Sequence, residues 1–197
     1  MFVNSDDEEK EKTAPQQEKE TLLKTRIIML FGEINKDSAN AVINSFIMLD
    51  NDDNKKPIWL YINSPGGEVD SGFAIYDIIK FVKSPVYVLG VGLVASAASL
   101  VYVSVPKERR FALPHSTYLI HQPLAKMQGV AIDVEMYAKR LDEIKALIND
   151  ILSSASGQDI SKITHDTDRD CYMSAQDAKK YGLVGNIITN ISEIKIK

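Results

Sequence analysis

One serine, one histidine and a group of aspartates have the types and positions that nucleophilic catalysis needs. Ser96 follows the apolar run 86–95 and stands among alanines, where a buried strand would turn into a helix. Unpaired N–H groups at the start of that helix would favour developing negative charge. A serine nucleophile also needs a base and a group that orients the base. His121, after the apolar residues 117–120, would be the base, and an aspartate within 166–170 would orient it.

The other two of the three histidines are weaker candidates for the base. His115 lies in a Pro-His-Ser turn and His165 in a polar segment, so both are interpreted as surface residues. No G-x-S-x-G motif surrounds Ser96, and the order Ser, His, Asp differs from that of the α/β-hydrolases. Since a lone histidine beside an apolar strand is more often structural, the residues alone leave a structural role for His121 open.

The glycines within 66–67 and 90–92 raise the question of a nucleotide-binding site. Residues 90–95 match the dinucleotide-binding spacing G-x-G-x-x-A after a strand. The apolar run ends at Val105, before Pro106, which is too short for a helix and a second parallel strand. The sequence has no G-x-x-x-x-G-K-[ST] motif, which excludes ATP hydrolysis by a phosphate loop. Residues 65–67 predict a tight turn whose N–H groups could approach a ligand oxygen closely.

A calcium loop is the third alternative. Asp166, Asp168, Asp170 and Asp177 have the spacing of positions one, three, five and twelve of an EF-hand. Cys171 stands where the loop needs glycine, and an aspartate replaces the final glutamate. A solvated acidic turn accounts for the pattern, and we expect no metal and no cofactor.

The elements that would position these residues alternate between strands and helices. Apolar, β-branched runs predict buried strands at residues 26–32, 58–62, 86–94, 117–121 and 184–189. Apolar residues three and four apart predict one helix that begins after a cap at Asp37 or Ser38, a second at 69–82 and a third at 134–152. Another helix is expected after Ser96. A short helix is predicted from Ser174, which resembles the start of a capping box, to Gly182, which would end it. A basic hinge is predicted at 107–110. This alternation indicates an α/β fold with a largely parallel sheet.

Length and composition narrow the class of protein. The 197 residues, 45% hydrophobic and 25% charged, suit one globular domain with a substantial core. A formal charge of −4 provides no electrostatic reason to expect nucleic acid as a partner. The single cysteine suits a reducing compartment, and no cationic-then-apolar leader opens the chain, so we expect a cytoplasmic protein. The uncharged run 84–106 is interpreted as a buried strand and helix rather than a membrane span.

The chain is predicted to have a flexible acidic N-terminal segment and one domain. Residues 1–20 are nearly all polar or charged, so they are expected to be disordered alone. Residues 21–197 would form the single domain.

Separated motifs in the right order resemble the proteolytic subunit family of the ATP-dependent Clp protease (ClpP). They are Tyr-Ile-Asn-Ser-Pro-Gly-Gly at 61–67, Gly-Leu-Val-Ala-Ser-Ala-Ala at 92–98, Tyr-Leu-Ile-His-Gln-Pro-Leu at 118–124 and Asp-Arg-Asp at 168–170. The likeness covers about residues 22–189. It implies a crotonase-like fold with repeated β-β-α type units, a largely parallel sheet and a protruding helix–strand handle at about 123–155.

The resemblance also implies the chemistry. Ser96 would be the nucleophile, His121 the general base and acid, and Asp170 the residue that orients His121. The N–H groups of Gly67 and Ala97 would form the oxyanion hole. Substrate polypeptide would lie along Leu124 and Ala125. The family usually has a glycine-rich segment after His-Gln-Pro-Leu, where this chain has Ala125 and Lys126.

The resemblance further implies an assembly of two stacked seven-membered rings. The handle would join the rings, and Asp168 and Arg169 would lie at the contact between them. Because the chain lacks an ATP motif, an AAA+ unfoldase of the ClpX, ClpA or ClpC type would feed the chamber. Its loop would dock on apolar residues that match the family's surface pocket, namely Trp59, Tyr61, Phe81, Phe111 and Ile188.

Two other functions remain as alternatives. The chain could be a divergent ClpP paralogue that acts mainly as a structural or regulatory subunit of a mixed complex. It could instead be a crotonase-like acyl-CoA enzyme, which shares the glycine oxyanion turn but needs no Ser-His-Asp set. The expected function is a serine endopeptidase subunit that degrades unfolded polypeptides, with no nucleic acid and no membrane as partner.

Overall fold

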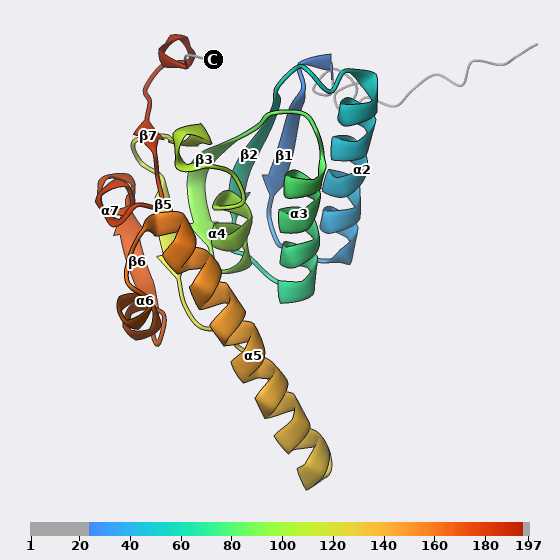
Figure 1. The fold of residues 1–197 in the computed structure, drawn as a ribbon, viewed down its shortest axis with the longest axis vertical. Coiled ribbons are helices and arrows are strands. Elements are labelled where there is room, and N and C mark those ends of the chain that lie inside the picture. Colours follow the sequence, from blue (N-terminus) through green and yellow to red (C-terminus); the bar gives the residue numbers. More distant parts are fainter. Residues whose placement is uncertain (1–23, 195–197) are drawn as a thin grey trace, which may run out of the picture.

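The computed structural model describes residues 24–194, so the predicted flexible segment 1–20 lies outside the described residues. In the first half of the domain each strand is followed by a helix (Figure 1). These elements are β1 (Ile27–Phe31), α2 (Lys36–Asp52), β2 (Ile58–Ser64), α3 (Val69–Phe81), β3 (Val86–Ala95) and α4 (Ala97–Tyr102).

The second half contains short strands and one long helix. Its elements are β4 (Arg110–Ala112), β5 (Thr117–Ile120), α5 (Ala131–Ser156), α6 (Ile160–Asp166), β6 (Cys171–Ser174), α7 (Ala175–Tyr181) and β7 (Asn186–Ile187), with 3₁₀ turns at Lys107–Arg109 and Ile191–Glu193.

The strands form one 7-stranded, mostly parallel sheet in the order β1-β2-β3-β4-β7. β3 is its longest strand, and Gly92 has a positive φ of 73° partway along it. Before this glycine β3 pairs with β2 and β4, and beyond it Leu93–Ala95 pair with β5. β5 also pairs with β6, which is antiparallel. The two segments of β3 and helix α4 thus form a strand–strand–helix unit. The mostly parallel sheet with helices between its strands confirms the α/β class predicted from the alternation.

The two faces of the sheet carry different clusters of side chains. Ile58, Leu60 and Ile62 of β2 are fully buried in the core that the helices cover. Their neighbours Trp59 and Tyr61 point to the opposite face, since side chains alternate along a strand. That face carries a second cluster, here called the aromatic cluster, which consists of Trp59, Tyr87, Leu89, Phe111 and Ile188.

Helix α5 projects away from the rest of the domain, as Figure 1 shows. Its C-terminal half is anchored, because Leu152 is buried in the core and Asn149 is 3% exposed. Its N-terminal half carries exposed apolar side chains, including Ile132 and Met136, which are 60% and 65% exposed. The apolar stripe predicted for 134–152 is therefore only partly covered within one chain.

Several local predictions are corrected by the structure. Helix α2 is capped by Asn35, with Ser38 at the third helical position, because the Asn35 side chain accepts from the Asp37 and Ser38 N–H groups. The predicted strand at 26–32 is not fully buried, since Phe31 is 45% exposed on the face that lacks helices. Only Asn186–Ile187 of the predicted strand 184–189 pair with a neighbour.

The predicted hinge and handle also differ in detail. Arg110 of the hinge begins β4 and is 4% exposed, with its guanidinium donating to the carbonyls of Val105 and Ala155. Residues 121–130 have no regular secondary structure, so the described chain has a handle helix without a handle strand. No helix in residues 24–194 is long and apolar enough to cross a membrane, and the run 84–106 forms β3 and α4.

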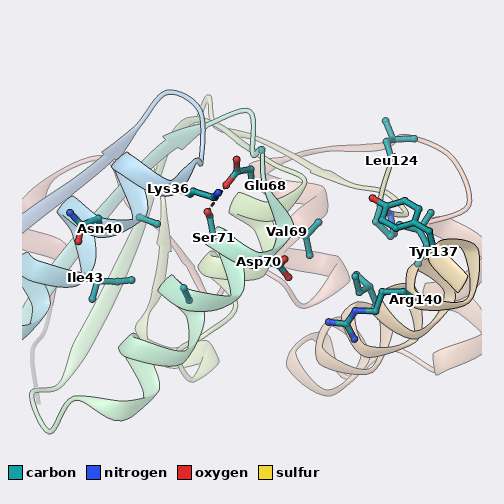
Figure 2. A pocket seen from close by; sticks show the side chains of 16 residues that line it. Lys36, Asn40, Ile43, Glu68, Val69, Asp70, Ser71, Leu124, Tyr137 and Arg140 are labelled. Atoms are coloured by element: carbon teal, nitrogen blue, oxygen red, sulfur yellow. Dashed lines mark hydrogen bonds between the residues drawn. The ribbon is translucent and has the colours of Figure 1, made fainter. Parts of the chain in front are cut away.

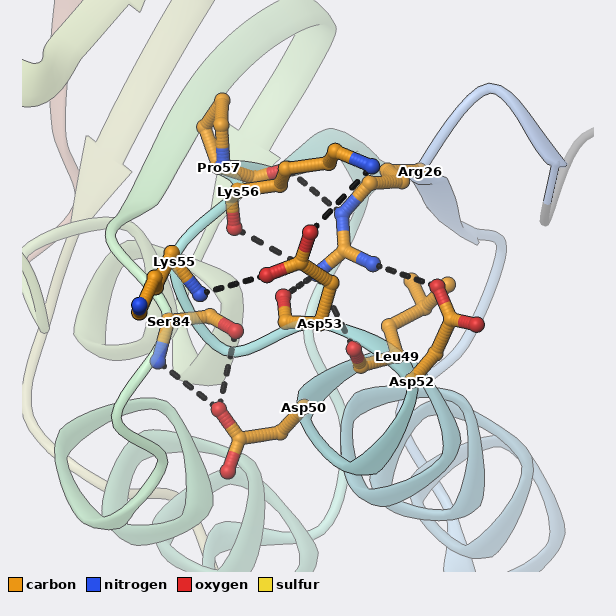
Figure 3. A network of polar contacts seen from close by, with 9 residues as sticks. All are labelled: Arg26, Leu49, Asp50, Asp52, Asp53, Lys55, Lys56, Pro57 and Ser84. Atoms are coloured by element: carbon orange, nitrogen blue, oxygen red, sulfur yellow. Dashed lines mark hydrogen bonds and ion pairs between the residues drawn. The ribbon is translucent and has the colours of Figure 1, made fainter.

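Arg26 ties the start of the sheet to the end of α2 (Figure 3). Its guanidinium donates to the carbonyls of Leu49, Asp53 and Pro57 at 3.0, 2.8 and 3.1 Å. The Leu49 carbonyl lies in the last turn of α2 and the Asp53 carbonyl at its C-cap, where the helix carries partial negative charge that a largely buried cation stabilises. Arg26 also pairs with Asp52 at 3.2 Å, although the Asp52 side chain is 74% exposed.

We expect Arg26→Ala to lower the free energy of unfolding by about 1–3 kcal/mol, because several carbonyls lose a charged donor. Asp52→Ala is the matched control and should cost less than about 1 kcal/mol, since it removes an exposed ion pair only. Urea denaturation at equal protein concentration measures both variants. Equal effects of the two substitutions would contradict the role assigned to the carbonyl contacts.

Candidate active site

Ser96 lies on the turn between β3 and α4, in an uncommon backbone conformation. Its φ is 57° and its ψ is −125°, and it is the residue that precedes the first turn of α4. A non-glycine residue with positive φ costs about 1–3 kcal/mol and persists only where its surroundings hold it. The Ser96 N–H donates to the Leu119 carbonyl at 2.9 Å, and the Ser99 hydroxyl donates to Val94 and Leu119 carbonyls. The hydrogen bonds thus hold the turn against β5.

Strand pairing brings His121 next to Ser96. Ala95 of β3 pairs with Leu119 of β5 in parallel register, so the residues that follow both strands emerge at the same edge of the sheet. The His121 side chain, 14% exposed, places its Nε2 atom 2.8 Å from the Ser96 Oγ atom. The other two histidines, His115 and His165, are exposed, as their segments predicted.

Asp170 reaches His121 from the antiparallel strand. β6 pairs Cys171 with Ile120, which sets Asp170 beside His121. The Asp170 Oδ1 atom lies 3.0 Å from His121 Nδ1. A neutral ring that donates from Nδ1 to Asp170 leaves Nε2 free to accept the Ser96 hydroxyl proton. Such an arrangement has the geometry that can activate a serine hydroxyl for attack on a carbonyl carbon.

Two backbone N–H groups beside Ser96 are available for an oxyanion. Ala97 is the first residue of α4, where an N–H group has no acceptor within the helix. Gly67 forms an isolated parallel bridge with Ile34 through its neighbours, and no hydrogen bond of the Gly67 N–H is found in residues 24–194. Both predicted oxyanion residues therefore lie at the turn with unpaired donors.

Gly66 is a site residue whose role the sequence did not indicate beyond a tight turn. It has φ of 89°, and a Cβ atom added there would lie 2.6 Å from the Ala95 carbonyl oxygen and 2.7 Å from Ser96 Cβ. The Gly66 N–H donates to the Ser64 hydroxyl at 3.1 Å. Only glycine lets the 64–67 segment approach the Ser96 turn this closely.

A second set of residues that sequence reasoning missed connects α5 to the loops of His121 and Asp170. Lys145 Nζ donates to the Gln122 side-chain oxygen at 2.9 Å, and the Gln122 side chain donates to the Asp168 carbonyl at 2.7 Å. The Thr167 hydroxyl donates to Asn149 at 3.0 Å. These partners are far apart along the chain, so no local pattern identifies them.

A cleft of about 810 Å³ opens beside Gly67, between α2 and α3 on one side and α5 on the other (Figure 2). Leu124 lines it and is 80% exposed, while Ala125 is exposed but does not line it. The walls are mainly apolar, and Glu68 and Asp70 bring carboxylates to the α3 side. Gly67 lines the cleft whereas Ser96, Ala97 and His121 do not, so the cleft adjoins one of the two candidate oxyanion donors.

The residues predicted for unfoldase docking and for the ring contact lie outside the Ser96 site. Trp59, Phe111 and Ile188 belong to the aromatic cluster, and Tyr61 packs against it. Phe81 does not belong to it: this residue ends α3 and is 83% exposed. Arg169 is exposed and has no hydrogen-bond or ion-pair partner within the described residues.

The alternative sites do not assemble in the described part of the chain. Asp166 pairs with Lys162 and Asp177 accepts from the Ser174 hydroxyl, so the aspartates of the calcium alternative have separate partners. No group of acidic, histidine and cysteine side chains in residues 24–194 has the arrangement of a metal site.

Burial raises the pKa of the Cys171 thiol, and the Asp166 carboxylate raises it further, so this thiol is a poor nucleophile.

Comparison with known proteins relates this geometry to one family. A family model described as Clp protease matches residues 9–191. The ATP-dependent Clp protease proteolytic subunit 2 of Treponema denticola is 43% identical over 198 residues, covering 100% of this chain and 99% of the relative. The subunit of the same name from Borreliella burgdorferi is 48% identical over 167 residues, covering 85% of this chain and 84% of the relative.

A solved structure agrees with these sequence matches. A point mutant of ClpP1 from Listeria monocytogenes superposes with a TM-score of 0.84 at 40% sequence identity. The superposition covers 89% of this chain and 98% of the Listeria chain. Fold and sequence similarity therefore extend over nearly the whole domain.

We expect Gly66→Ala to slow the reaction of Ser96 with a fluorophosphonate by about 100-fold, because the added methyl group displaces the Ser96 turn. Gly32→Ala is the matched control. Gly32 has a similar positive φ of 82°, but no atom lies within 4 Å of an added Cβ. Both variants carry the same kind of backbone strain, so the difference in labelling rate isolates the contact with Ser96. Equal labelling rates would contradict the role assigned to Gly66.

Proposed function

This chain belongs to the Clp protease family, and we propose that Ser96, His121 and Asp170 are its catalytic triad. The chain is a serine endopeptidase subunit that degrades unfolded polypeptides inside a chamber fed by an ATP-dependent unfoldase. The observation that carries the residue assignment is the unbroken hydrogen-bonded path from Asp170 through His121 to the Ser96 hydroxyl.

The proposed reaction begins with acyl transfer to Ser96. His121 Nε2 accepts the hydroxyl proton as Oγ attacks the peptide carbonyl, and the carboxylate of Asp170 stabilises the imidazolium that forms. The carbonyl oxygen becomes an oxyanion, which accepts hydrogen bonds from the N–H groups of Gly67 and Ala97. Each such donor contributes about 3–4 kcal/mol to transition-state stabilisation.

The second half of the reaction restores the enzyme. His121 donates its proton to the leaving amine, and the carbon–nitrogen bond breaks to leave an ester on Ser96. Water then attacks this ester with His121 again as the base, releasing the carboxylic acid product. No metal or organic cofactor takes part in the proposed steps.

We assign the cleft beside Gly67 to the substrate. An extended polypeptide would lie between the 67–69 segment and Leu124 and Ala125, with side chains entering the cleft of about 810 Å³. Exposed apolar Leu124 provides a contact for substrate side chains. Because Ala125 replaces a glycine that is usual in the family, its methyl group would narrow this path.

Family membership implies an oligomeric assembly and a Clp ATPase as partner. We propose two stacked heptamers that meet through the α5 handle, whose exposed apolar side chains need a covering surface. Asp168 and Arg169, both exposed, would lie at this contact. Lys145 lies 3.8 Å from Asp168, so ring contact and triad position would be linked through α5.

We propose that the unfoldase docks on the aromatic cluster through apolar side chains. Trp59, Phe111 and Ile188 provide the surface, and Tyr61 borders it. Phe81 lies outside this cluster, so its predicted docking role has weaker structural support than that of the other residues. The unfoldase would be of the ClpX, ClpA or ClpC type, and a cytoplasmic location suits the single cysteine.

A mixed complex with a ClpP paralogue is the second candidate. Relatives named proteolytic subunit 2 favour it, since the number marks one of several such subunits. In that case this chain would contribute its active site, or only its surfaces, to a shared particle.

We expect Ser96→Ala and His121→Ala each to lower the peptidase activity by about 10⁴-fold or more, because the triad residues act as a unit. Hydrolysis of a fluorogenic peptide and of an unfolded protein by the assembled particle measures the loss. His115→Ala is the matched control, since His115 is exposed and outside the site.

The same experiment separates the alternatives. Unchanged activity of a mixed particle that contains Ser96→Ala would identify this chain as a structural subunit. Failure of wild-type Ser96 to react with a fluorophosphonate, together with acyl-CoA turnover, would instead support the crotonase-like alternative.

We expect Met136→Glu to shift the native mass from a two-ring particle toward single rings, because the charge falls on the proposed contact between rings. Met136 is 65% exposed in the single chain, so the substitution should leave the monomer fold intact. Sedimentation velocity gives the mass and circular dichroism checks the fold. A full two-ring mass would contradict the proposed role of α5.

A further inference from the structure

The last described residues of the chain return to the aromatic cluster. After β7 the chain forms the 3₁₀ turn Ile191–Glu193, seen at the C-terminal end in Figure 1. Ile194, directly after this turn, is partly buried and packs against the cluster. Ile191 in the same turn is 73% exposed. One of two isoleucines three positions apart is thus directed onto the cluster.

Hydrogen bonds hold this turn in place. The Glu193 carboxylate accepts from the Thr189 N–H, the Thr189 hydroxyl and the Asn190 N–H at 2.8, 2.8 and 2.7 Å. The Asn190 side chain accepts from the Ser192 N–H at 2.9 Å. The contacts between Asn190 and Glu193 form a capping box, and these hydrogen bonds determine where Ile194 lies.

An open cavity lies beside Ile194 on the same surface. It has a volume of about 590 Å³, and Tyr87, Phe111 and Ile188 of the aromatic cluster line it together with Glu193 of the turn. Within the cluster Trp59 stacks on Tyr87 at 4.9 Å between ring centroids. Glu193 of the C-terminal turn therefore lines a cavity in which apolar Tyr87, Phe111 and Ile188 lie together with the polar side chains of Glu108, Arg109 and Asn186.

We propose that the turn 190–194 is an intramolecular occupant of this surface, and that an apolar side chain of a protein partner displaces Ile194 when it binds. The inference rests on the proposed docking of the unfoldase on the aromatic cluster. The partner chemistry follows from the cluster residues that line the cavity, because an aliphatic or aromatic side chain gains from contact with Tyr87, Phe111 and Ile188. The position of the turn then determines how much of the aromatic cluster is accessible to the partner.

Trp59 belongs to the cluster against which Ile194 packs, and it is the only tryptophan of the chain, so its fluorescence reports on the packing of this cluster. Trp59 is 8% exposed with Ile194 in place. Ile194→Ser should increase quenching of Trp59 fluorescence by acrylamide in the full-length assembled protein. Ile191→Ser is the matched control, since it makes the same change on the exposed side of the same turn and should leave quenching unchanged.

The second measurement is the affinity for an apolar probe, the capped dipeptide acetyl-Leu-Phe-amide. When its own chain covers the surface part of the time, the apparent affinity for a probe equals the intrinsic affinity multiplied by the fraction of molecules in which the surface is uncovered. Ile194→Ser should therefore bind the probe about three- to tenfold more tightly than wild type. Glu193→Ala keeps Ile194 but removes the hydrogen bonds that hold the turn, and should shift both readouts in the same direction.

The outcomes are distinguishable. Identical quenching in wild type, Ile194→Ser and Glu193→Ala would show that Ile194 does not cover the cluster, which overturns this inference and leaves the proposed docking intact. Increased quenching without binding of the probe to any variant would overturn both the competition and the docking surface. Increased quenching with tighter binding in Ile194→Ser, and neither in Ile191→Ser, is the expected result.

Discussion

The active site depends on the register of three strands. β3 and β5 are parallel with Ala95 opposite Leu119, and β5 and β6 are antiparallel with Ile120 opposite Cys171. Residues that directly follow or precede these pairs, Ser96, His121 and Asp170, must then meet at one edge of the sheet. Since a shift of one residue would turn each side chain to the other face, the register determines whether the site exists at all.

Close packing under the nucleophile is the second requirement. Ser96 adopts a positive φ, which neighbouring contacts must compensate, and β5 carbonyls and the glycine turn at 66–67 surround it. The same turn contains Gly67, so one segment both packs on Ser96 and carries the N–H group proposed for the oxyanion. Stability and chemistry here depend on the same few backbone contacts, which is typical of strained active sites.

Two apolar regions of the single chain differ in how far they are covered, since α5 has exposed apolar side chains whereas the five members of the aromatic cluster are buried. The N-terminal half of α5 projects with Ile132 and Met136 exposed, while its C-terminal half contacts the loops of the triad through Lys145 and Asn149. The aromatic cluster on the helix-free face is partly covered by Ile194. Under the proposed function, assembly through α5 and partner binding at the aromatic cluster would both take place away from Ser96.

The sequence by itself determined the alternation of strands and helices, the strand-to-helix turn at Ser96 and the position of His121 after a strand, because periodicity and turn residues act over a few neighbouring positions. From the residues alone the orienting aspartate stayed open within 166–170, and resemblance to a family selected Asp170. Only the tertiary structure decided that Gly66 packs on Ser96, that Phe81 lies apart from the aromatic cluster and that α5 is covered over half its length. Those features arise from contacts between segments far apart in the chain, and their energies depend on register and packing that no local pattern encodes.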